Sequence, residues 1–246
     1  MRSIVCLFFV SAFVAASAPA FAQVYGAVTG TDVSRAESAM VSVYCRIPGT
    51  QRAWVSSGVV IQSDTTGDER RGEVVITTAH GVGHYGDDRH DECFVEGPDG
   101  GHYRVIRTFN PPTLASSWED WAVVVTSRPF EGPAVRLPVR GIQGVEGDVP
   151  VAMVGRDFTN PQCRLSRSRR VNDGGRLVYT HTCGSRRGLS GAPILAQVDG
   201  EMAVIAINVG RLSGGAGPGQ RAIARGVGDG FDAMIQRGFE ASAPLR

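Results

Sequence analysis

Three short segments of the chain carry side chains that can act together as a nucleophile, a base and an orienting carboxylate. His80 ends one apolar run, Asp120 begins another, and Ser190 lies in a turn flanked by glycines. A serine hydroxyl becomes an effective nucleophile when a histidine accepts its proton, and a carboxylate keeps the imidazole in the required tautomer. These residue types, in this order, predict hydrolysis through an acyl-enzyme formed on Ser190.

Each of the three signals is weak when it is taken alone. A histidine at a strand end is more often structural than catalytic, and an aspartate before a strand is commonly a turn or capping residue. Glu119 is adjacent to Asp120, and further carboxylates stand closer to the histidine in the sequence: Asp87, Asp88, Asp91 and Asp99. Asp120 is favoured because the apolar run after it places this carboxylate at the start of a buried strand.

The elements that must position these residues have the pattern of short strands. Apolar, β-branched runs alternate with turn signals, and Asp-Gly pairs such as residues 99–100 and 199–200 suit hairpin turns. Short strands at this spacing predict an all-β sandwich or barrel. The predicted strands are residues 40–45, 58–61, 73–77, 93–95, 103–106, 121–125, 149–154, 176–180, 193–195 and 202–207.

Composition agrees with a folded, turn-rich protein. Of 246 residues, 42% are hydrophobic and 20% are charged, which argues against disorder, and 32 glycines with 13 prolines suit many turns between short strands. Helical periodicity is confined to residues 230–240. Residues 23–31 resemble a leader of small residues, and the Pro- and Gly-rich residues 128–147 indicate a crossing between two halves.

Net charge gives no reason to expect a nucleic acid or a membrane as partner. The 25 basic residues, all of them arginine, are balanced by 24 acidic ones, so the formal net charge is +1. Seven arginines nevertheless crowd one stretch: Arg164, Arg167, Arg169, Arg170, Arg176, Arg186 and Arg187. They suit either a solvated strand face, which is the interpretation we favour, or a surface that attracts acidic substrates or an anionic cell surface.

The first 22 residues have the features of a cleaved secretory signal peptide. Arg2 is followed by an apolar run over residues 4–16, and Ala20-Phe21-Ala22 provides a small-x-small cleavage site. The apolar run is too short for the alternative, a membrane anchor. We therefore expect a mature chain, residues 23–246, that is secreted or periplasmic and has no stable membrane anchor.

Four cysteines remain after the signal peptide, and they suit two disulfides in an oxidising compartment. We favour the pairs Cys45–Cys93 and Cys163–Cys183, because each bond then lies within one half of the chain. No Cys-x-x-Cys spacing suggests zinc. Histidine and carboxylates in residues 84–92 have the chemistry to bind Ca²⁺ or Zn²⁺, but the stretch fits no standard pattern and suits a surface loop better. We therefore predict no metal and no cofactor.

The segments around His80, Asp120 and Ser190 resemble the T-A-A-H, D-I-A-L and G-x-S-G-x-P signatures of trypsin-like serine peptidases with the chymotrypsin fold. The resemblance extends from Met40 to the C-terminal helix and is greater to bacterial secreted members than to digestive enzymes. It implies two six-stranded antiparallel β-barrels, with His80 and Asp120 in the first barrel, Ser190 in the second, and the active site in the cleft between them. The implied ranges are about 33–127 for the first barrel, about 145–229 for the second, and 230–240 for a short C-terminal helix.

The same resemblance implies the remaining parts of a peptidase site. The backbone N–H groups of Gly188 and Ser190 would form the oxyanion hole. The substrate would be a protein or a peptide, and the residues implied to bind it are Thr182, Gly184, Asn208, Val209 and Gly210. We expect the protein to act as a monomer.

Three departures from the family pattern leave other functions open. Leu189 precedes the serine, where digestive enzymes have an aspartate that pairs with a newly cut N-terminus, and Gly81 replaces a cysteine after the histidine. The short spacing between Asp120 and Ser190 implies trimmed loops in the second barrel. A non-catalytic binding module on the same fold can carry such changes, and the same triad also suits an esterase.

Overall fold

The computed structural model describes residues 23–47, 49–63, 70–82, 92–111, 119–142, 145, 147–167, 178–212, 221–228 and 230–243. The predicted signal peptide, residues 1–22, and most of the possible cation-binding stretch, residues 84–92, lie outside these ranges. The described residues form thirteen strands and three helices.

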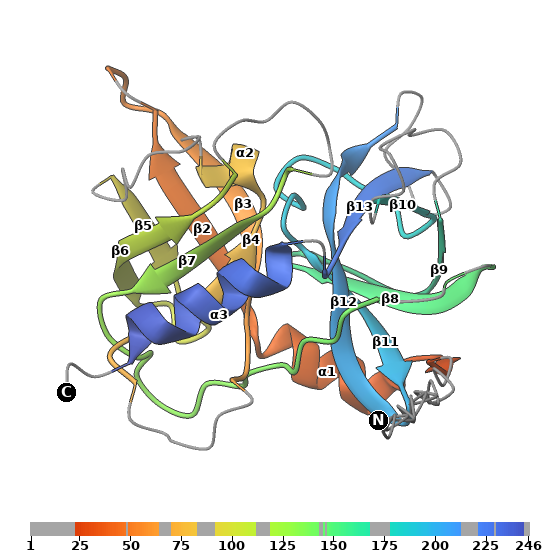
Figure 1. Ribbon diagram of the computed structural model, residues 1–246. Coiled ribbons are helices and arrows are strands. Elements are labelled where there is room, and N and C mark those ends of the chain that lie inside the picture. The colour runs from red at the N-terminus through yellow and green to blue at the C-terminus, as the bar shows by residue number, and fades with distance from the viewer. Residues whose placement is uncertain are drawn as a thin grey trace, which may run out of the picture.

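The first barrel consists of six antiparallel strands that close on themselves (Figure 1). In order around the barrel they are β2 (Met40–Arg46), β3 (Ala53–Val60), β4 (Val74–Thr77), β7 (Ala122–Thr126), β6 (His102–Phe109) and β5 (Cys93–Glu96), and β5 pairs with β2. Its interior includes the fully buried residues Val43, Val75 and Val124. Such β-branched side chains pack well on a pleated surface, which explains why these runs form strands.

The second barrel also has six antiparallel strands and lies beside the first (Figure 1). In order they are β8 (Val149–Gly155), β9 (Phe158–Arg167), β10 (Val178–His181), β13 (Ala222–Gly226), β12 (Glu201–Arg211) and β11 (Pro193–Val198), and β11 pairs with β8. The predicted all-β fold with two six-stranded antiparallel barrels is therefore confirmed, and it fits a chymotrypsin-like fold.

The C-terminal helix α3 (Phe231–Ser242) follows the second barrel and lies across the first (Figure 1). It contacts β4, β6 and β7 of the first barrel, and the ring of Phe231 stacks on Trp121 at a centroid distance of 5.0 Å. The core that receives this helix also contains Leu195 and Val204 of the second barrel. The helix predicted over residues 230–240 is thus confirmed, and it helps to hold the two barrels together.

The prediction that only residues 230–240 are helical is wrong, because Gly30–Glu37 forms helix α1. Thr29 caps this helix: its hydroxyl accepts a hydrogen bond from the backbone of Asp32, whose carboxylate accepts one from the backbone of Thr29. This capping box stabilises a helix start that a short apolar face alone does not reveal. The segment predicted as a leader, residues 23–31, also contains a short strand, β1 (Tyr25–Gly26), which pairs with β11.

The predicted set of strands omits two members of the second barrel. β9 contains Pro161 and arginines that interrupt its apolar alternation, and proline within a run is evidence against a strand. β13 is short and follows a glycine-rich stretch. Both strands form because their partners in the barrel supply the hydrogen bonds, which no local pattern records.

The structure contains the disulfides Cys45–Cys93 and Cys163–Cys183, the pairing favoured from the sequence. The first joins β2 to β5 at positions that face each other in register. The second connects β9 to the segment after β10. Two disulfides indicate an oxidising, extracellular environment. Among the described residues, no helix has the length and apolar character needed to span a membrane.

Removal of the two disulfides should lower the stability by different amounts. The chain-entropy estimate gives a loss of about 4 kcal/mol for Cys45–Cys93 and about 3 kcal/mol for Cys163–Cys183, because their sequence separations are 48 and 20 residues. Denaturant unfolding of the two double-alanine variants measures these losses. The reverse order would contradict an origin in loop entropy.

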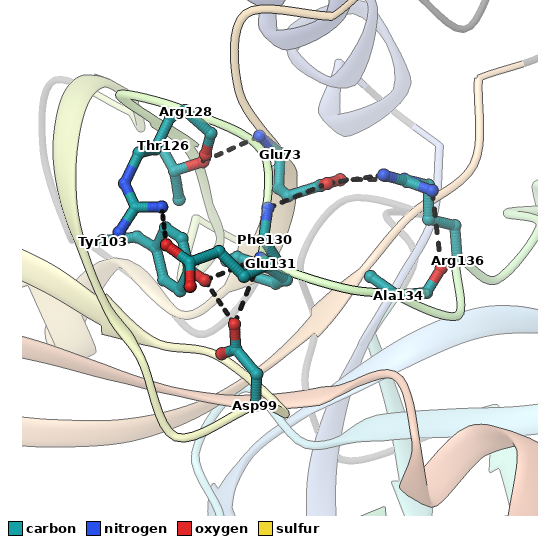
Figure 2. A network of polar contacts seen from close by, with 9 residues as sticks. All are labelled: Glu73, Asp99, Tyr103, Thr126, Arg128, Phe130, Glu131, Ala134 and Arg136. Carbon is teal, nitrogen blue, oxygen red and sulfur yellow. Dashed lines mark hydrogen bonds and ion pairs between the residues drawn. The ribbon is translucent and has the colours of Figure 1, made fainter.

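A network of polar contacts holds the segment that leaves the first barrel after β7 (Figure 2). The carboxylate of Glu73 is fully buried and accepts two hydrogen bonds from the guanidinium of Arg136, at 2.8 and 2.5 Å. The backbone N–H of Glu73 donates to the hydroxyl of Thr126 at 2.7 Å. Beyond Arg136 the segment bridges the barrels, since Leu137 pairs with Ile61 of the first barrel and Val139 with Val204 of the second.

Candidate active site

The end of β4 and the start of β7 bring His80 and Asp120 together. His80 lies on α2 (Ala79–Val82), a single helical turn that follows β4. Its backbone N–H donates to Oδ1 of Asp120 at 3.0 Å, and its ring Nδ1 lies 2.6 Å from Oδ2 of the same carboxylate. Because the carboxylate binds both the backbone and the ring of His80, it fixes the orientation of the imidazole. Asp120 is only 4% exposed.

The other ring nitrogen of His80 faces Ser190. Nε2 lies 2.8 Å from the serine Oγ, while 37% of the histidine side chain remains exposed. The structure therefore brings the three predicted residues into one hydrogen-bonded chain from carboxylate to imidazole to hydroxyl, across the junction of the two barrels. This is the arrangement that a histidine base requires in order to take a proton from a serine nucleophile.

Contacts from strand β3 of the first barrel hold the turn that carries Ser190. The backbone N–H of Ser57 donates to the Ser190 carbonyl at 2.8 Å, and the Ser57 hydroxyl donates to the Gly188 carbonyl at 2.7 Å. The backbone of Gly191 is left-handed, with a φ of 84°, and an added Cβ there would clash with the Ser57 carbonyl. Ser57 therefore positions the serine turn, and no local pattern in the sequence indicates this role, because a serine in a strand gives no distinguishing signal.

The two backbone N–H groups predicted for the oxyanion hole have no hydrogen-bond partner within the described part of the chain. The amides of the neighbouring residues are occupied: the Leu189 N–H donates to the backbone carbonyl of Arg186 at 3.1 Å, and the Gly191 N–H donates to the backbone carbonyl of Asn208 at 2.8 Å. Gly188 has a φ of 88°, which suits glycine far better than other residues. The turn therefore leaves free the amides of Gly188 and Ser190, which are the donors that an oxyanion requires.

Leu189, the residue before the serine, is held in place by apolar packing. Its side chain is 2% exposed and belongs to the core of the second barrel. It lies so close to Gly155 that an added Cβ there would clash with it. The Leu189 carbonyl also accepts a hydrogen bond from Nδ2 of Asn208 at 2.7 Å. Apolar packing and this amide hydrogen bond thus hold the residue before Ser190.

Close packing explains why residue 81 is a glycine. A Cβ at this position would lie 2.5 Å from Oγ and 2.6 Å from Cβ of Ser56 on β3. Close packing of Gly81 on Ser56 therefore leaves no room for a larger side chain, such as cysteine, after the histidine. The first barrel has its disulfide elsewhere, between Cys45 and Cys93.

The residues predicted to bind substrate lie in two segments, of which the one that contains Val209 borders Ser190. The carbonyl of Val209 lies 3.4 Å from the serine Oγ, and the pairing of β12 with β13 shifts register between Asn208 and Gly210. Thr182 and Gly184 follow β10, and the Thr182 hydroxyl accepts a hydrogen bond from the backbone of another strand. Substrate binding by these five residues stays a prediction.

The side chain of Asn208 is fully buried and joins a polar network beneath the serine turn. Its Oδ1 lies 3.0 Å from Nε2 of His181, and its Nδ2 donates to the hydroxyl of Ser185 at 3.1 Å as well as to the Leu189 carbonyl. His181 is 1% exposed. Burial lowers the pKa of His181 to about 4, since desolvation disfavours the charged imidazolium.

The buried His181 should make the protein less stable in acid. Its pKa is about 4 in the folded state and 6.5 in the unfolded chain, so the unfolded state binds more protons between these values. The stabilising contribution is complete above pH 6.5 and falls by about 3 kcal/mol as the pH approaches 4. Urea unfolding at pH 7 and pH 4.5 measures this loss. The free energy of unfolding of the variant His181→Gln should depend less on pH than that of the wild type. The exposed control His102→Gln should behave like the wild type. Equal pH dependence in the wild type and both variants would contradict a role for His181 in the acid sensitivity.

The described residues offer no obvious metal centre: they contain no group of three or more histidine, cysteine, aspartate or glutamate side chains arranged to hold an ion.

Comparison with known proteins assigns no family to the chain. No protein-family model matches the sequence, and no curated protein shows significant similarity to it. The functional interpretation therefore depends on the fold and on the geometry of His80, Asp120 and Ser190.

Proposed function

We propose that this protein is a trypsin-like serine endopeptidase that hydrolyses peptide bonds through an acyl-enzyme on Ser190. The observation that carries the proposal is the continuous set of contacts from Asp120 Oδ2 to His80 Nδ1 at 2.6 Å, and from His80 Nε2 to Ser190 Oγ at 2.8 Å. With the predicted signal peptide and the two disulfides, this supports a secreted or periplasmic hydrolase.

The proposed reaction starts when Ser190 Oγ attacks the carbonyl carbon of the scissile bond. His80 accepts the hydroxyl proton, and Asp120 stabilises the imidazolium that forms. The carbonyl oxygen gains negative charge as the tetrahedral intermediate forms, and the amides of Gly188 and Ser190 are the donors available for it. His80 then protonates the leaving amine, which departs and leaves an ester on Ser190. Water activated by the same histidine hydrolyses this ester.

A fluorophosphonate probe, which phosphonylates activated serines, tests the proposal directly. The exported wild-type protein should be labelled on Ser190, and Ser190→Ala and His80→Ala should abolish the labelling. Digestion of a proteome-derived peptide library should then give cleaved peptides and reveal which residues precede the cut. A folded wild-type protein that neither reacts with the probe nor cleaves any peptide would contradict the proposal and favour the non-catalytic binding module.

An esterase using the same triad is distinguished by comparing matched ester and amide substrates. An endopeptidase should cleave internal peptide bonds of the library, whereas an esterase should hydrolyse only the activated esters. The 2.8 Å contact between His80 and Ser190 counts against a binding module, since a module without catalysis has no need of an aligned base.

A further inference from the structure

A groove with a volume of about 260 Å³ adjoins the turn that carries the candidate oxyanion hole. One side consists of first-barrel residues from β2 and β3, including Ser42, Ser56 and Ser57. The other side belongs to the second barrel and includes Gly188 and Leu189 of the serine turn. The groove thus follows the junction of the barrels and begins next to the amide proposed to bind the oxyanion.

Three arginines line this groove, and we call it the basic groove: Arg156, Arg186 and Arg187. Among the described residues that line the groove, Asp157 is the one carboxylate. Arg186 and Arg187 belong to the arginine-rich stretch of the sequence, whereas Arg156 comes from the turn between β8 and β9. Two residues of that stretch thus line a groove, although the interpretation favoured from the sequence was a solvated strand face.

Contacts between the barrels hold Arg156 at the groove. Its guanidinium donates to the hydroxyls of Tyr44 and Ser42 and lies 3.3 Å from a carboxylate oxygen of Glu96, all on the first barrel. Its side chain remains 48% exposed, so the charge is accessible from the groove. Arg186 is oriented by a hydrogen bond to the backbone carbonyl of Asp157 at 2.7 Å, a contact that leaves its positive charge unneutralised.

The position of the groove assigns it to the leaving-group side of the reaction. Asn208, Val209 and Gly210 of β12 are among the residues implied to bind substrate, and the Val209 carbonyl lies 3.4 Å from Ser190 Oγ, so we assign the acyl part of a substrate to this strand. The basic groove contains no residue of β12 and borders the serine turn from the first-barrel side. A peptide bound along β12 and attacked at Ser190 would therefore continue, after the scissile bond, into this groove.

We propose that the basic groove binds the substrate segment that follows the scissile bond and selects acidic side chains there. This inference rests on the proposed function. Guanidinium groups recognise carboxylates by charge-assisted hydrogen bonds. Arg156 already pairs with Glu96, so Arg186 and Arg187 supply most of the positive charge that the groove offers to a substrate. The same arginines would repel a lysine or arginine side chain of the substrate at these positions.

The selection should be limited to the positions nearest the scissile bond. Ser42 and Arg156 also line a larger cavity of about 630 Å³, which lies farther from the serine turn and extends to α1. That cavity contains four carboxylates: Glu37, Glu96, Asp99 and Glu131. The sign of the lining charge thus reverses beyond Arg156, so acidic side chains farther along the substrate should gain nothing.

Acyl transfer isolates this side of the site, because one acyl-enzyme can be partitioned between water and different peptide amides. An ester substrate forms the acyl-enzyme, and Ala-Glu-amide, Ala-Ala-amide and Ala-Lys-amide then compete with water for it. The partition ratio does not depend on how fast the acyl-enzyme forms. Summing the modest energies of exposed ion pairs, we expect Ala-Glu-amide to be captured about tenfold better than Ala-Lys-amide at low salt. Added salt should reduce the preference.

A charge change in the groove should remove the preference. Arg187→Glu leaves two arginines and two carboxylates in the lining, so it should capture Ala-Glu-amide and Ala-Lys-amide about equally, and Arg156→Gln should weaken the preference of the wild type. The matched control Arg237→Glu changes the net charge equally but lies on α3, so it should keep the wild-type preference. Equal capture of the three amides by a wild-type acyl-enzyme overturns the groove assignment alone, whereas a protein that forms no acyl-enzyme overturns the proposed function.

Discussion

Replacement of either Ser190 or His80 by alanine should lower kcat for peptide hydrolysis by about 10⁶-fold, and the double replacement should lower it no further. The reason is that the two residues act as one unit: the base has no proton to accept without Ser190, and the hydroxyl has no acceptor without His80. The activity that remains would come from substrate binding and the amides of the serine turn alone.

Asp120→Asn should be less damaging than either of these changes, with a loss of about 10⁴-fold in the Ser-His-Asp template. An amide in place of the carboxylate still packs beside the ring, but it favours the wrong tautomer of His80 and cannot stabilise the imidazolium. Burst kinetics with an activated ester, which count functional sites and separate acylation from deacylation, measure all four variants.

The matched control for these replacements is His102→Ala, which removes an exposed histidine on β6 and should leave kcat unchanged. Multiplicative losses in the Ser190→Ala/His80→Ala double variant would show that the two side chains contribute independently. That outcome would contradict the assignment of a nucleophile and its base.

The sequence permits prediction of the triad because each member lies at the end or start of a strand. His80 and Asp120 adjoin β4 and β7, which pair with each other in the barrel, and Ser190 lies in a glycine turn just before β11. Such junctions leave local signals: an apolar run, then a polar side chain, or a serine between residues that tolerate left-handed backbone. The barrels can be predicted from local signals too, since β-branched runs that alternate with turns favour closed antiparallel sheets.

What the sequence could not show are contacts between segments far apart in the chain. Ser57 holds the serine turn from a strand more than a hundred residues away, and Arg156 joins Arg186 and Arg187 only through the folding of the second barrel. The fold places the arginines of this stretch on different surfaces, since Arg186 and Arg187 line the groove and Arg164 does not. Arg164 lies on β9 beside Asp148, which fits the solvated strand face that the sequence favoured. Helix α1 is a different case, because its Thr29 and Asp32 capping pair is visible in the sequence, but eight residues are too few for a clear apolar periodicity.

Loss of the ion pair between the fully buried Glu73 carboxylate and Arg136, whose side chain is 32% exposed, should give the largest loss of stability among single side-chain changes in the segment between the barrels. The Glu73 carboxylate is fully buried, and the guanidinium supplies both of its charged hydrogen bonds (Figure 2). Arg136→Met would leave that carboxylate buried without its counter-ion, which costs about 3–5 kcal/mol. For a chain of this length, such a loss lowers Tm by about 6–20 °C.

The double variant Glu73→Leu/Arg136→Met distinguishes the cost of an unpaired charge from the value of the pair itself. Replacing both partners by apolar side chains removes the buried charge, so most of the lost stability should return, because desolvation of a buried pair offsets much of its attraction. Arg128→Met is the matched control, since its partner Glu131 is exposed and the same change of residue type should alter Tm far less. A double variant as unstable as Arg136→Met would show instead that the ion pair itself, by fixing the segment that joins the barrels, provides the stability.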